Sequence, residues 1–371
     1  MPEHAAAATT EPTSGADRTL EGAHGAAARA FLDFLASIRP AVETRLEARW
    51  QREIDRIKGY GPEIEAMAAE ARSLTLRGGK RYRAGLVVAA HLGVAPEAPL
   101  DAAYDTAAAL ELIQTYLLIQ DDWIDEDDTR RGGPSVHAAL GRSLKNERLG
   151  AVSALLASDL TWSLAVGLLA AAPADPSLVL ATLRTFCETH QDVVVGQHLD
   201  VLGRAEDVEQ MHALKTGSYT VRGPLLLGAT LAGASGDVLA ALERYAAPVG
   251  VAFQLRDDLL GTFGSEAETG KPVGNDLRNG KRTAVIAWID GRLDASGQSI
   301  LDRAFGKSEA TPDEVAEATA LLVTAGARTA VEDRLDALCT EAERLAAELP
   351  VSARAREILA GAAAALRWRQ R

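Results

Sequence analysis

Apolar residues recur every three or four positions along most of this chain, which is the spacing of one face of an α-helix. The first such run begins near Ala26, continues through Phe31 and Ile38, and is expected to stop before Pro40. Later breaks rich in glycine and proline follow at helix-length intervals, so the pattern predicts roughly a dozen helices. We therefore expect a disordered tail at residues 1–24 and a single all-helical domain, all-α in class, over residues 25–371.

Composition strengthens the helical interpretation and narrows the class of partner. Apolar residues make up 47% of the chain and aromatic residues only 5%, a mixture that favours helices almost throughout. The formal net charge of −13 is opposite in sign to that of a protein that binds a phosphate backbone. Nucleic acid is therefore not expected as a partner.

The cysteines and the apolar segments bear on the compartment. Cys187 and Cys339 form neither a metal-ligand spacing nor a disulfide framework, which is consistent with a reducing cytoplasm. The N-terminal residues lack the basic and apolar regions of a signal peptide. Residues 151–172 are apolar but interrupted by serine, threonine and aspartate, so we interpret them as a buried core helix. A cytoplasmic protein without a membrane span is expected.

Two Asp-rich elements, each at the end of an apolar run, are the most informative feature of the chain. They are Asp-Asp-Trp-Ile-Asp at residues 121–125 and Asp-Asp at residues 257–258. Asp121 and Asp125 are four apart and would share one helix face. Carboxylates beside buried surface need a partner, and Mg²⁺ takes a few carboxylates together with substrate phosphates. The alternative is two N-cap or salt-bridged acidic clusters at helix ends.

Cationic motifs accompany the acidic ones. Gly-Gly-Lys-Arg-Tyr-Arg at residues 78–83 places three cations behind a glycine pair, and Arg-Arg at residues 130–131 follows the first acidic helix. A glycine-punctuated loop at residues 270–283 follows the second and is a candidate lid. Guanidinium groups suit phosphate oxygens, and lysine supplies a point charge. Each basic cluster alone is more typical of a solvated helix end.

Taken in order, these motifs resemble those of the trans-isoprenyl diphosphate synthases, or polyprenyl synthetases. The likeness runs from about Leu76 to Ile286. It comprises Gly-Gly-Lys-Arg-x-Arg (78–83), Asp-Asp-x-x-Asp with Arg-Arg-Gly (121–132), Gly-Gln-x-x-Asp (196–200), Lys-Thr (215–216), Phe-Gln-x-x-Asp-Asp (253–258), and Gly-Lys-Pro with Gly-Lys-Arg-Thr (270–283). The resemblance implies a bundle of antiparallel helices around a deep cavity, usually a homodimer. It also implies the head-to-tail condensation of isopentenyl diphosphate with an allylic diphosphate.

The resemblance further implies a role for each motif residue. Metal ligation would fall to Asp121, Asp125 and Asp257, with Asp122 in support, and three Mg²⁺ ions would be held when substrate is bound. The allylic diphosphate would also be contacted by Arg130, Lys215, Lys271 and Lys281. Isopentenyl diphosphate would be bound by Lys80, Arg83 and Arg131, and by Gln114 where many relatives carry His. Gln197 would join substrate binding, and Thr216 and Gln254 would line the reacting centre.

Two features of the resemblance concern product length and metal affinity. Tyr116 and Leu117 lie where this family limits the growing chain, and Tyr116 is about 7.5 Å before Asp121 along a helix. An aromatic residue only at this position implies the twenty-carbon product, geranylgeranyl diphosphate, with farnesyl diphosphate or a longer chain as the alternative. Gly261 replaces the last acid of the second Asp-rich motif and leaves the metal affinity of that motif open. We expect activity to survive this replacement.

Other classes of function stay open beside this one. A non-catalytic partner subunit would typically lose acids from the first Asp-rich motif, and this chain retains them. A class I terpene cyclase would share the fold and the Mg²⁺ but has no use for a second diphosphate site. The basic segment at residues 367–371 either covers the isopentenyl diphosphate site or is a frayed helix end.

Overall fold

Helices make up most of the chain that the structure describes, which confirms the predicted all-α class. The computed structural model describes residues 23–202, 210–211, 213–265 and 274–368, and these contain fifteen α-helices. The larger ones are α1 (Ala23–Ile57), α2 (Pro62–Leu76), α3 (Tyr82–Val94), α4 (Asp101–Ile124), α5 (Val136–Leu144), α6 (Glu147–Ala170), α7 (Pro176–Leu202), α9 (Gly223–Leu231) and α10 (Gly236–Phe263). The C-terminal part adds α12 (Asn275–Arg278), α13 (Ala284–Ile289), α14 (Ala295–Ala304), α15 (Pro312–Thr324), α16 (Ala327–Glu348) and α17 (Ala353–Ala365).

Four short elements complete the described chain. The π-helix η1 (Ala213–Arg222) leads directly into α9, and the 3-10 helix η2 (Leu366–Trp368) follows α17. The strands β1 (Thr129–Arg130) and β2 (Gly133–Pro134) pair antiparallel in a hairpin after α4. π-Helical turns are rare and occur often at functional sites. The helix η1 carries two of the predicted site residues, Lys215 and Thr216.

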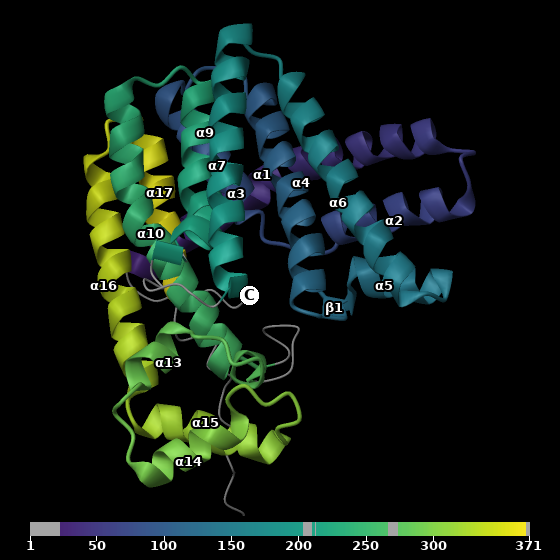
Figure 1. Ribbon diagram of the computed structural model, residues 1–371. Coiled ribbons are helices and arrows are strands. Elements are labelled where there is room, and N and C mark those ends of the chain that lie inside the picture. Colours follow the sequence, from purple (N-terminus) through teal and green to yellow (C-terminus); the bar gives the residue numbers. More distant parts are fainter. Residues whose placement is uncertain (1–22, 203–209, 212, 266–273, 369–371) are drawn as a thin grey trace, which may run out of the picture.

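The long helices stand side by side in one bundle (Figure 1). Helices α3, α4, α7, α9 and α10 form its centre, with α6 packed on α4, α16 packed on α10, and α17 packed between α1 and α16. Helices α13, α14 and α15 form a smaller group beyond the end of α10. The two Asp-rich helices, α4 and α10, therefore belong to the same bundle and end on the same side of it.

Large apolar side chains hold the bundle together. Trp50, Phe31, Tyr245 and Phe253 are all fully buried, and the ring of Tyr82 contacts both phenylalanine rings at centroid distances of 5.3 and 5.5 Å. Burial of a single such side chain contributes about 1.5–3 kcal/mol to folding. The frame around the predicted site is therefore densely packed.

The predicted end of the first helix before Pro40 is wrong. Helix α1 runs through Pro40 to Ile57 because its apolar face continues on the far side, where Val42, Leu46 and Trp50 are fully buried. A proline in a helix interior costs about 3 kcal/mol. Burial of three large side chains beyond it outweighs this cost.

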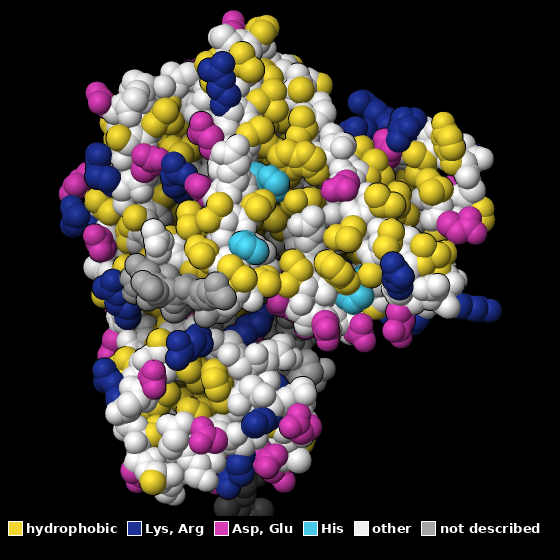
Figure 2. Space-filling view, viewed as in Figure 1, with side chains coloured by type: hydrophobic (Ala, Val, Ile, Leu, Met, Phe, Trp, Pro, Cys, Tyr) yellow, Lys and Arg dark blue, Asp and Glu magenta, His cyan; other side chains and the backbone are white. Residues whose placement is uncertain are grey.

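Helix α6 corresponds to the segment predicted as a buried core helix, and the prediction holds for one face only. That face packs on α4, whereas Leu149, Val152 and Leu156 are 46%, 45% and 55% exposed. Helix α6 is also the one described helix that is long and apolar enough to cross a membrane, a test that core helices of other proteins pass too. Hydrophobic side chains gather over this part of the surface (Figure 2).

Candidate functional site

A single large cavity collects almost every residue singled out in the sequence. Its volume is about 1780 Å³, and it lies among α3, α4, α7, η1 and α10. The predicted site residues on its wall are Lys80, Arg83, Gln114, Leu117, Asp121, Asp125, Arg130, Arg131, Gln197, Lys215, Thr216, Gln254, Asp257 and Lys281. Asp122 and Tyr116 lie behind the wall, and Lys271 lies outside the described residues.

The first Asp-rich motif ends α4 and faces cations across the cavity. Asp121 lies 3.5 Å from the Nζ atom of Lys215 and 3.6 Å from the guanidinium of Arg130. Asp125 accepts a hydrogen bond of 3.0 Å from Lys281, which comes from the loop before α13. Burial alone would lower the pKa of Lys281, but Asp125 raises it above its ordinary value. Cationic side chains thus neutralise the carboxylates of both Asp121 and Asp125.

Asp122 lies away from the cavity and holds Arg130. Its side chain is fully buried, and its Oδ1 atom accepts a hydrogen bond of 2.5 Å from the Nε atom of Arg130. Burial raises the pKa of Asp122 to about 6, although Arg130 opposes the shift. This placement suits a residue that orients Arg130 toward the cavity.

The π-helix η1 carries Lys215 and Thr216 against helix α7. Lys215 donates a hydrogen bond of 2.5 Å to Asp200 on α7. Helix α7 approaches this closely because residue 196 is glycine, since a Cβ atom there would stand 2.7 Å from the Cα atom of Lys215. Burial alone would lower the pKa of Lys215. The negative charges of Asp121 and Asp200 outweigh burial and raise this pKa above its ordinary value.

The two aspartates of the second motif have different surroundings. Both line the cavity, but Asp258 is nearly buried, with 4% of its surface exposed. Asp258 accepts hydrogen bonds of 2.7 Å from both the Nε2 atom of Gln254 and the backbone N–H of Ala284, the first residue of α13. Burial raises the pKa of Asp258 to about 7. Sequence reasoning assigned no role to Asp258, and the structure makes it the clamp between α10 and the segment that carries Lys281.

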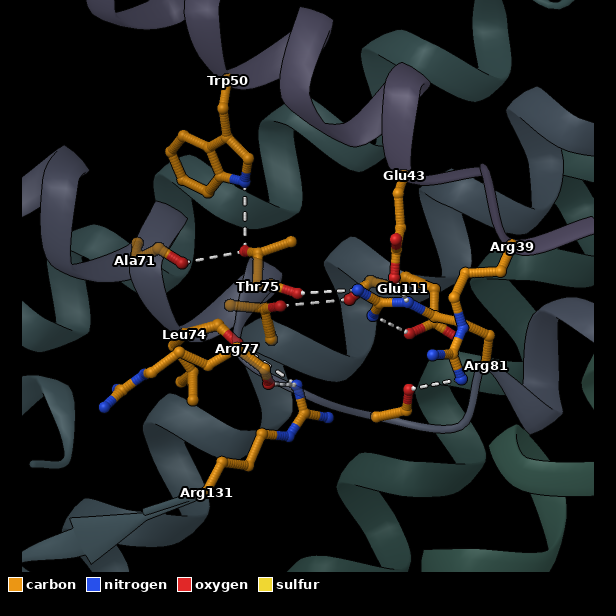
Figure 3. A network of polar contacts seen from close by, with 12 residues as sticks. Arg39, Glu43, Trp50, Ala71, Leu74, Thr75, Arg77, Arg81, Glu111 and Arg131 are labelled. Carbon is orange, nitrogen blue, oxygen red and sulfur yellow. Dashed lines mark hydrogen bonds and ion pairs between the residues drawn. The ribbon is translucent and has the colours of Figure 1, made fainter. Parts of the chain in front are cut away.

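A buried ion network supports the cationic motif of the cavity wall (Figure 3). Arg81 is 2% exposed and donates to Glu111 of α4 at 2.8 Å, to Glu43 of α1 at 3.3 Å, and to the carbonyl oxygen of Thr75 at 3.3 Å. Its backbone is left-handed, with φ of 56°, and it directly precedes the first residue of α3, Tyr82. Lys80 and Arg83 both line the cavity, but only Arg83 lies within α3.

Arg131 is fixed by the end of helix α2. Its guanidinium donates to the carbonyl oxygens of Leu74 and Arg77 at 3.2 and 3.1 Å, as drawn in Figure 3. Burial lowers the pKa of Arg131 to about 10, Glu111 opposes that shift, and the neighbouring arginines add to it. Arg77 in turn donates to the carbonyl oxygen of Pro134 in the hairpin at 2.9 Å. A buried cation with a lowered pKa is suited to receive an anion.

Several polar atoms in the cavity wall have no hydrogen-bond partner among the described residues. They are Oε1 of Gln114, Nε2 of Gln197 and Nε of Arg83. The Arg83 guanidinium donates to Thr220 at 2.7 Å and lies 4.4 Å from the centre of the Tyr219 ring. Buried polar groups are normally paired, so these atoms suit contacts with a polar ligand.

The acidic end fits a divalent metal that shares its ligands with a substrate. Within the described ranges, no three Asp, Glu, His or Cys side chains come together closely enough to hold an ion by themselves. Mg²⁺ keeps several waters and takes one or two carboxylates plus phosphate oxygens, so it does not need such a cluster. Asp121 and Asp125 at the end of α4 and Asp257 of α10 line the same cavity and meet that requirement.

An aromatic layer lies behind the cavity wall. The ring of Tyr116 is 5.2 Å from that of His190 on α7 and 6.0 Å from that of Trp162 on α6. Trp162 also stacks on His190 at 4.5 Å and on Phe186 at 5.4 Å. Burial lowers the pKa of His190, so this imidazole is held neutral. Sequence reasoning found Tyr116 but not its neighbours, because only the packing of three helices brings them together.

The C-terminal segment was predicted either to cover the second diphosphate site or to fray. Arg367 does neither, because it forms ion pairs with Asp336 and Glu343 of α16. Trp368 lines the cavity, and residues 369–371 lie outside the described chain.

Comparison with known proteins identifies close relatives of this arrangement. Residues 65–322 match the family model described as polyprenyl synthetase. The chain is 36% identical to a geranylgeranyl diphosphate synthase of Mycobacterium tuberculosis over 256 residues, which cover 67% of this chain and 69% of that protein. It is 34% identical to the farnesyl diphosphate synthase of Geobacillus stearothermophilus over 267 residues, which cover 67% of this chain and 82% of that protein.

A solved structure agrees over more of the chain. The geranylgeranyl pyrophosphate synthase of Corynebacterium glutamicum, complexed with isoprenyl diphosphate and magnesium, superposes with a TM-score of 0.81 and 31% identity. The superposition covers 90% of this chain and 98% of that one.

Proposed function

Because this chain belongs to the polyprenyl synthetase family and is a prenyltransferase, we propose that it condenses isopentenyl diphosphate with an allylic diphosphate to give geranylgeranyl diphosphate. The twenty-carbon length is the specific part of this proposal, since relatives of similar identity include both geranylgeranyl and farnesyl diphosphate synthases.

One observation carries the proposal, namely that a single cavity has two parts suited to diphosphate in different ways. The acidic end presents Asp121, Asp125 and Asp257, which need a metal to bind an anion. The cationic part of the same cavity presents Lys80, Arg83 and Arg131, which bind an anion directly. A terpene cyclase with one diphosphate substrate has no use for the second set.

The residues at the acidic end promote departure of the diphosphate from the allylic substrate. A divalent metal held by Asp121, Asp125 and Asp257 would neutralise charge on that leaving group. Lys215, Lys281 and Arg130 line the same cavity and would stabilise the negative charge that develops as the carbon–oxygen bond breaks.

The remaining wall determines what reacts with the allylic cation. Leu117, Leu118 and Phe253 are apolar and keep water from it. The double bond of isopentenyl diphosphate, held by its own diphosphate at the cationic part, supplies the electron pair for the new carbon–carbon bond. A proton then leaves the neighbouring carbon for the released diphosphate, so no protein nucleophile is required.

The direct test uses the purified full chain with isopentenyl diphosphate, Mg²⁺ and each of the dimethylallyl, geranyl and farnesyl diphosphates. We expect a twenty-carbon product by mass spectrometry. A fifteen-carbon or longer product would keep the reaction and discard the proposed length. No product with any primer would favour a partner subunit, and a hydrocarbon or alcohol formed from geranylgeranyl diphosphate alone would favour a cyclase.

Product length should respond to the ring of Tyr116. We expect Tyr116→Ala to yield products longer than those of the wild type. The substitution removes the tyrosine ring that packs against Trp162 and His190, and so leaves room for a longer hydrocarbon chain. The matched control is Tyr104→Ala, on the same helix but packed under the guanidinium of Arg45 rather than against Trp162 and His190. Product sizing by mass spectrometry checks both variants, and unchanged length in Tyr116→Ala contradicts the steric role.

We also propose that the chain forms a homodimer through the exposed face of α6. Leu149, Val152 and Leu156 lie three and four positions apart, so they form one apolar stripe on that helix. Contiguous exposed apolar surface of this kind is typical of an interface.

A charge placed in the stripe on α6 should separate the dimer. We expect Leu156→Glu to shift the protein from dimer to monomer, since an unpaired carboxylate would be buried at the interface. Val323→Glu, at a residue that is 43% exposed on α15, is the control and should remain a dimer. Size-exclusion chromatography with light scattering distinguishes the states, and a dimeric Leu156→Glu protein places the interface elsewhere.

A further inference from the structure

The second Asp-rich helix has no acidic residue one helical turn beyond Asp257. That position is Gly261, four residues on and therefore on the same face of α10. The space above Gly261 is filled from another element. A Cβ atom built on Gly261 would stand 2.6 Å from the Cγ atom and 3.3 Å from the Oδ1 atom of Asp276, and would overlap its Oδ2 atom.

Asp276 belongs to the short helix α12, and the surrounding packing fixes that helix in place. Leu277 next to it is 1% exposed, and its carbonyl oxygen accepts a hydrogen bond of 2.9 Å from the backbone N–H of Gly306. Gly274 begins α12 with φ of +68°, and a Cβ atom there would collide with Val315 of α15. The position of the Asp276 carboxylate over Gly261 therefore follows from a packed element.

The same carboxylate faces the acidic end of the cavity. Asp276 and Gly261 both line it, together with Asp257 and Lys281. The backbone carbonyl of Asp276 accepts a hydrogen bond of 2.9 Å from the N–H of Lys281, and the negative charge of Asp276 contributes to the raised pKa of Lys281. Asp276 is thus within electrostatic reach of the residues that would bind the allylic diphosphate.

We propose that Asp276 supplies, from α12, the carboxylate that residue 261 of α10 does not provide, and so completes the second divalent-metal site beside Asp257. This inference rests on the proposed function. The sequence left the metal affinity of the second Asp-rich motif open because of Gly261. The inference assigns the missing carboxylate to a residue of α12. It also explains why a side chain is absent at residue 261, because any side chain there would displace the Asp276 carboxylate.

The test measures metal binding rather than turnover. Mn²⁺ is titrated into the full-length protein with inorganic diphosphate present, and bound Mn²⁺ is followed by electron paramagnetic resonance. We expect Asp276→Asn to weaken the binding of at least one ion by about tenfold or more, in line with other perturbed ligand sets. The matched control is Asp290→Asn, an exposed acid just after α13, which should bind as the wild type does.

Moving the acid from residue 276 to residue 261 tests whether Asp276 is a metal ligand or only orients Lys281. Gly261→Asp alone should lower the melting temperature, since the new side chain meets Asp276. The double variant Gly261→Asp with Asp276→Ser should regain Mn²⁺ binding relative to Asp276→Ser, because the acid is then carried by α10. Wild-type Mn²⁺ binding in Asp276→Asn, or no recovery in the double variant, overturns the inference. Absence of Mn²⁺ binding by the wild-type protein would instead remove the metal site of the proposed function.

Discussion

Replacing Asp121 with Asn should lower kcat/KM for the allylic diphosphate by about 10²- to 10³-fold, the loss typical of removing one group that stabilises transition-state charge. Asp121 faces both Lys215 and Arg130, so it lies where the metal and the cations of the acidic end must meet. Asparagine keeps the size of the side chain but removes the charge that attracts a divalent ion. Steady-state kinetics at several Mg²⁺ concentrations measure the effect, and higher Mg²⁺ should recover part of the activity.

The control for this change is another aspartate of the same segment. The side chain of Asp128 is 84% exposed, and its carboxylate lies 3.7 Å from the imidazole of His137. Asp128→Asn should therefore keep wild-type kinetics. If Asp121→Asn retains full activity, or if it raises KM for isopentenyl diphosphate alone, the acidic end does not bind the allylic diphosphate as proposed.

Replacing Glu111 with Gln should raise KM for isopentenyl diphosphate by about tenfold or more, since one charge-assisted contact contributes about 1.5–3 kcal/mol. Glu111 is the buried partner of Arg81, and Arg81 fixes the backbone between Lys80 and Arg83. Its charge also opposes the lowering of the pKa of Arg131 by burial. KM for the allylic diphosphate should change little. The free energy of unfolding should fall by about 3–5 kcal/mol, because a buried cation loses its partner.

Two further variants distinguish positioning from general loss of stability. Glu43→Gln removes the other partner of Arg81, but the Glu43 side chain is 38% exposed and 3.3 Å away, so both constants should stay near the wild-type values. Arg81→Met combined with Glu111→Leu should restore much of the unfolding free energy, since a buried pair is often replaced by apolar residues without loss. It should not restore KM for isopentenyl diphosphate. Equal changes in both Michaelis constants in Glu111→Gln would contradict the positioning role.

The sequence predicted those parts of the site that depend on short spacings. Asp121 and Asp125 share a helix face because four positions make about one turn, and the structure places both on the cavity wall. The order of the motifs was enough to predict two sets of charged residues in one bundle. The sequence did not predict which side chains lie behind the cavity wall. Asp122 and Tyr116 lie behind it because the turn of the helix points them toward Arg130 and Trp162.

The missed features depend on contacts between distant segments. Glu111 and Arg81 are 30 positions apart, and nothing in the local sequence of either indicates the other. The same holds for Asp276 over Gly261 and for Trp162 against His190. The end predicted at Pro40 failed for a related reason, since burial of the residues after the proline decides whether the helix continues. Local patterns give periodicity and motif order, whereas tertiary packing gives partners.

The ion pairs on the acidic wall have a consequence for how ligands bind together. Lys215 and Lys281 already neutralise Asp121 and Asp125, so a metal that binds alone must displace a cation from each carboxylate. A diphosphate that arrives with the metal accepts the displaced lysines as its own partners. Metal and diphosphate should therefore bind with positive cooperativity, and linkage requires that each raise the affinity of the other by the same factor. The empty enzyme would then leave cellular Mg²⁺ largely untouched and take it up only with a substrate able to use it.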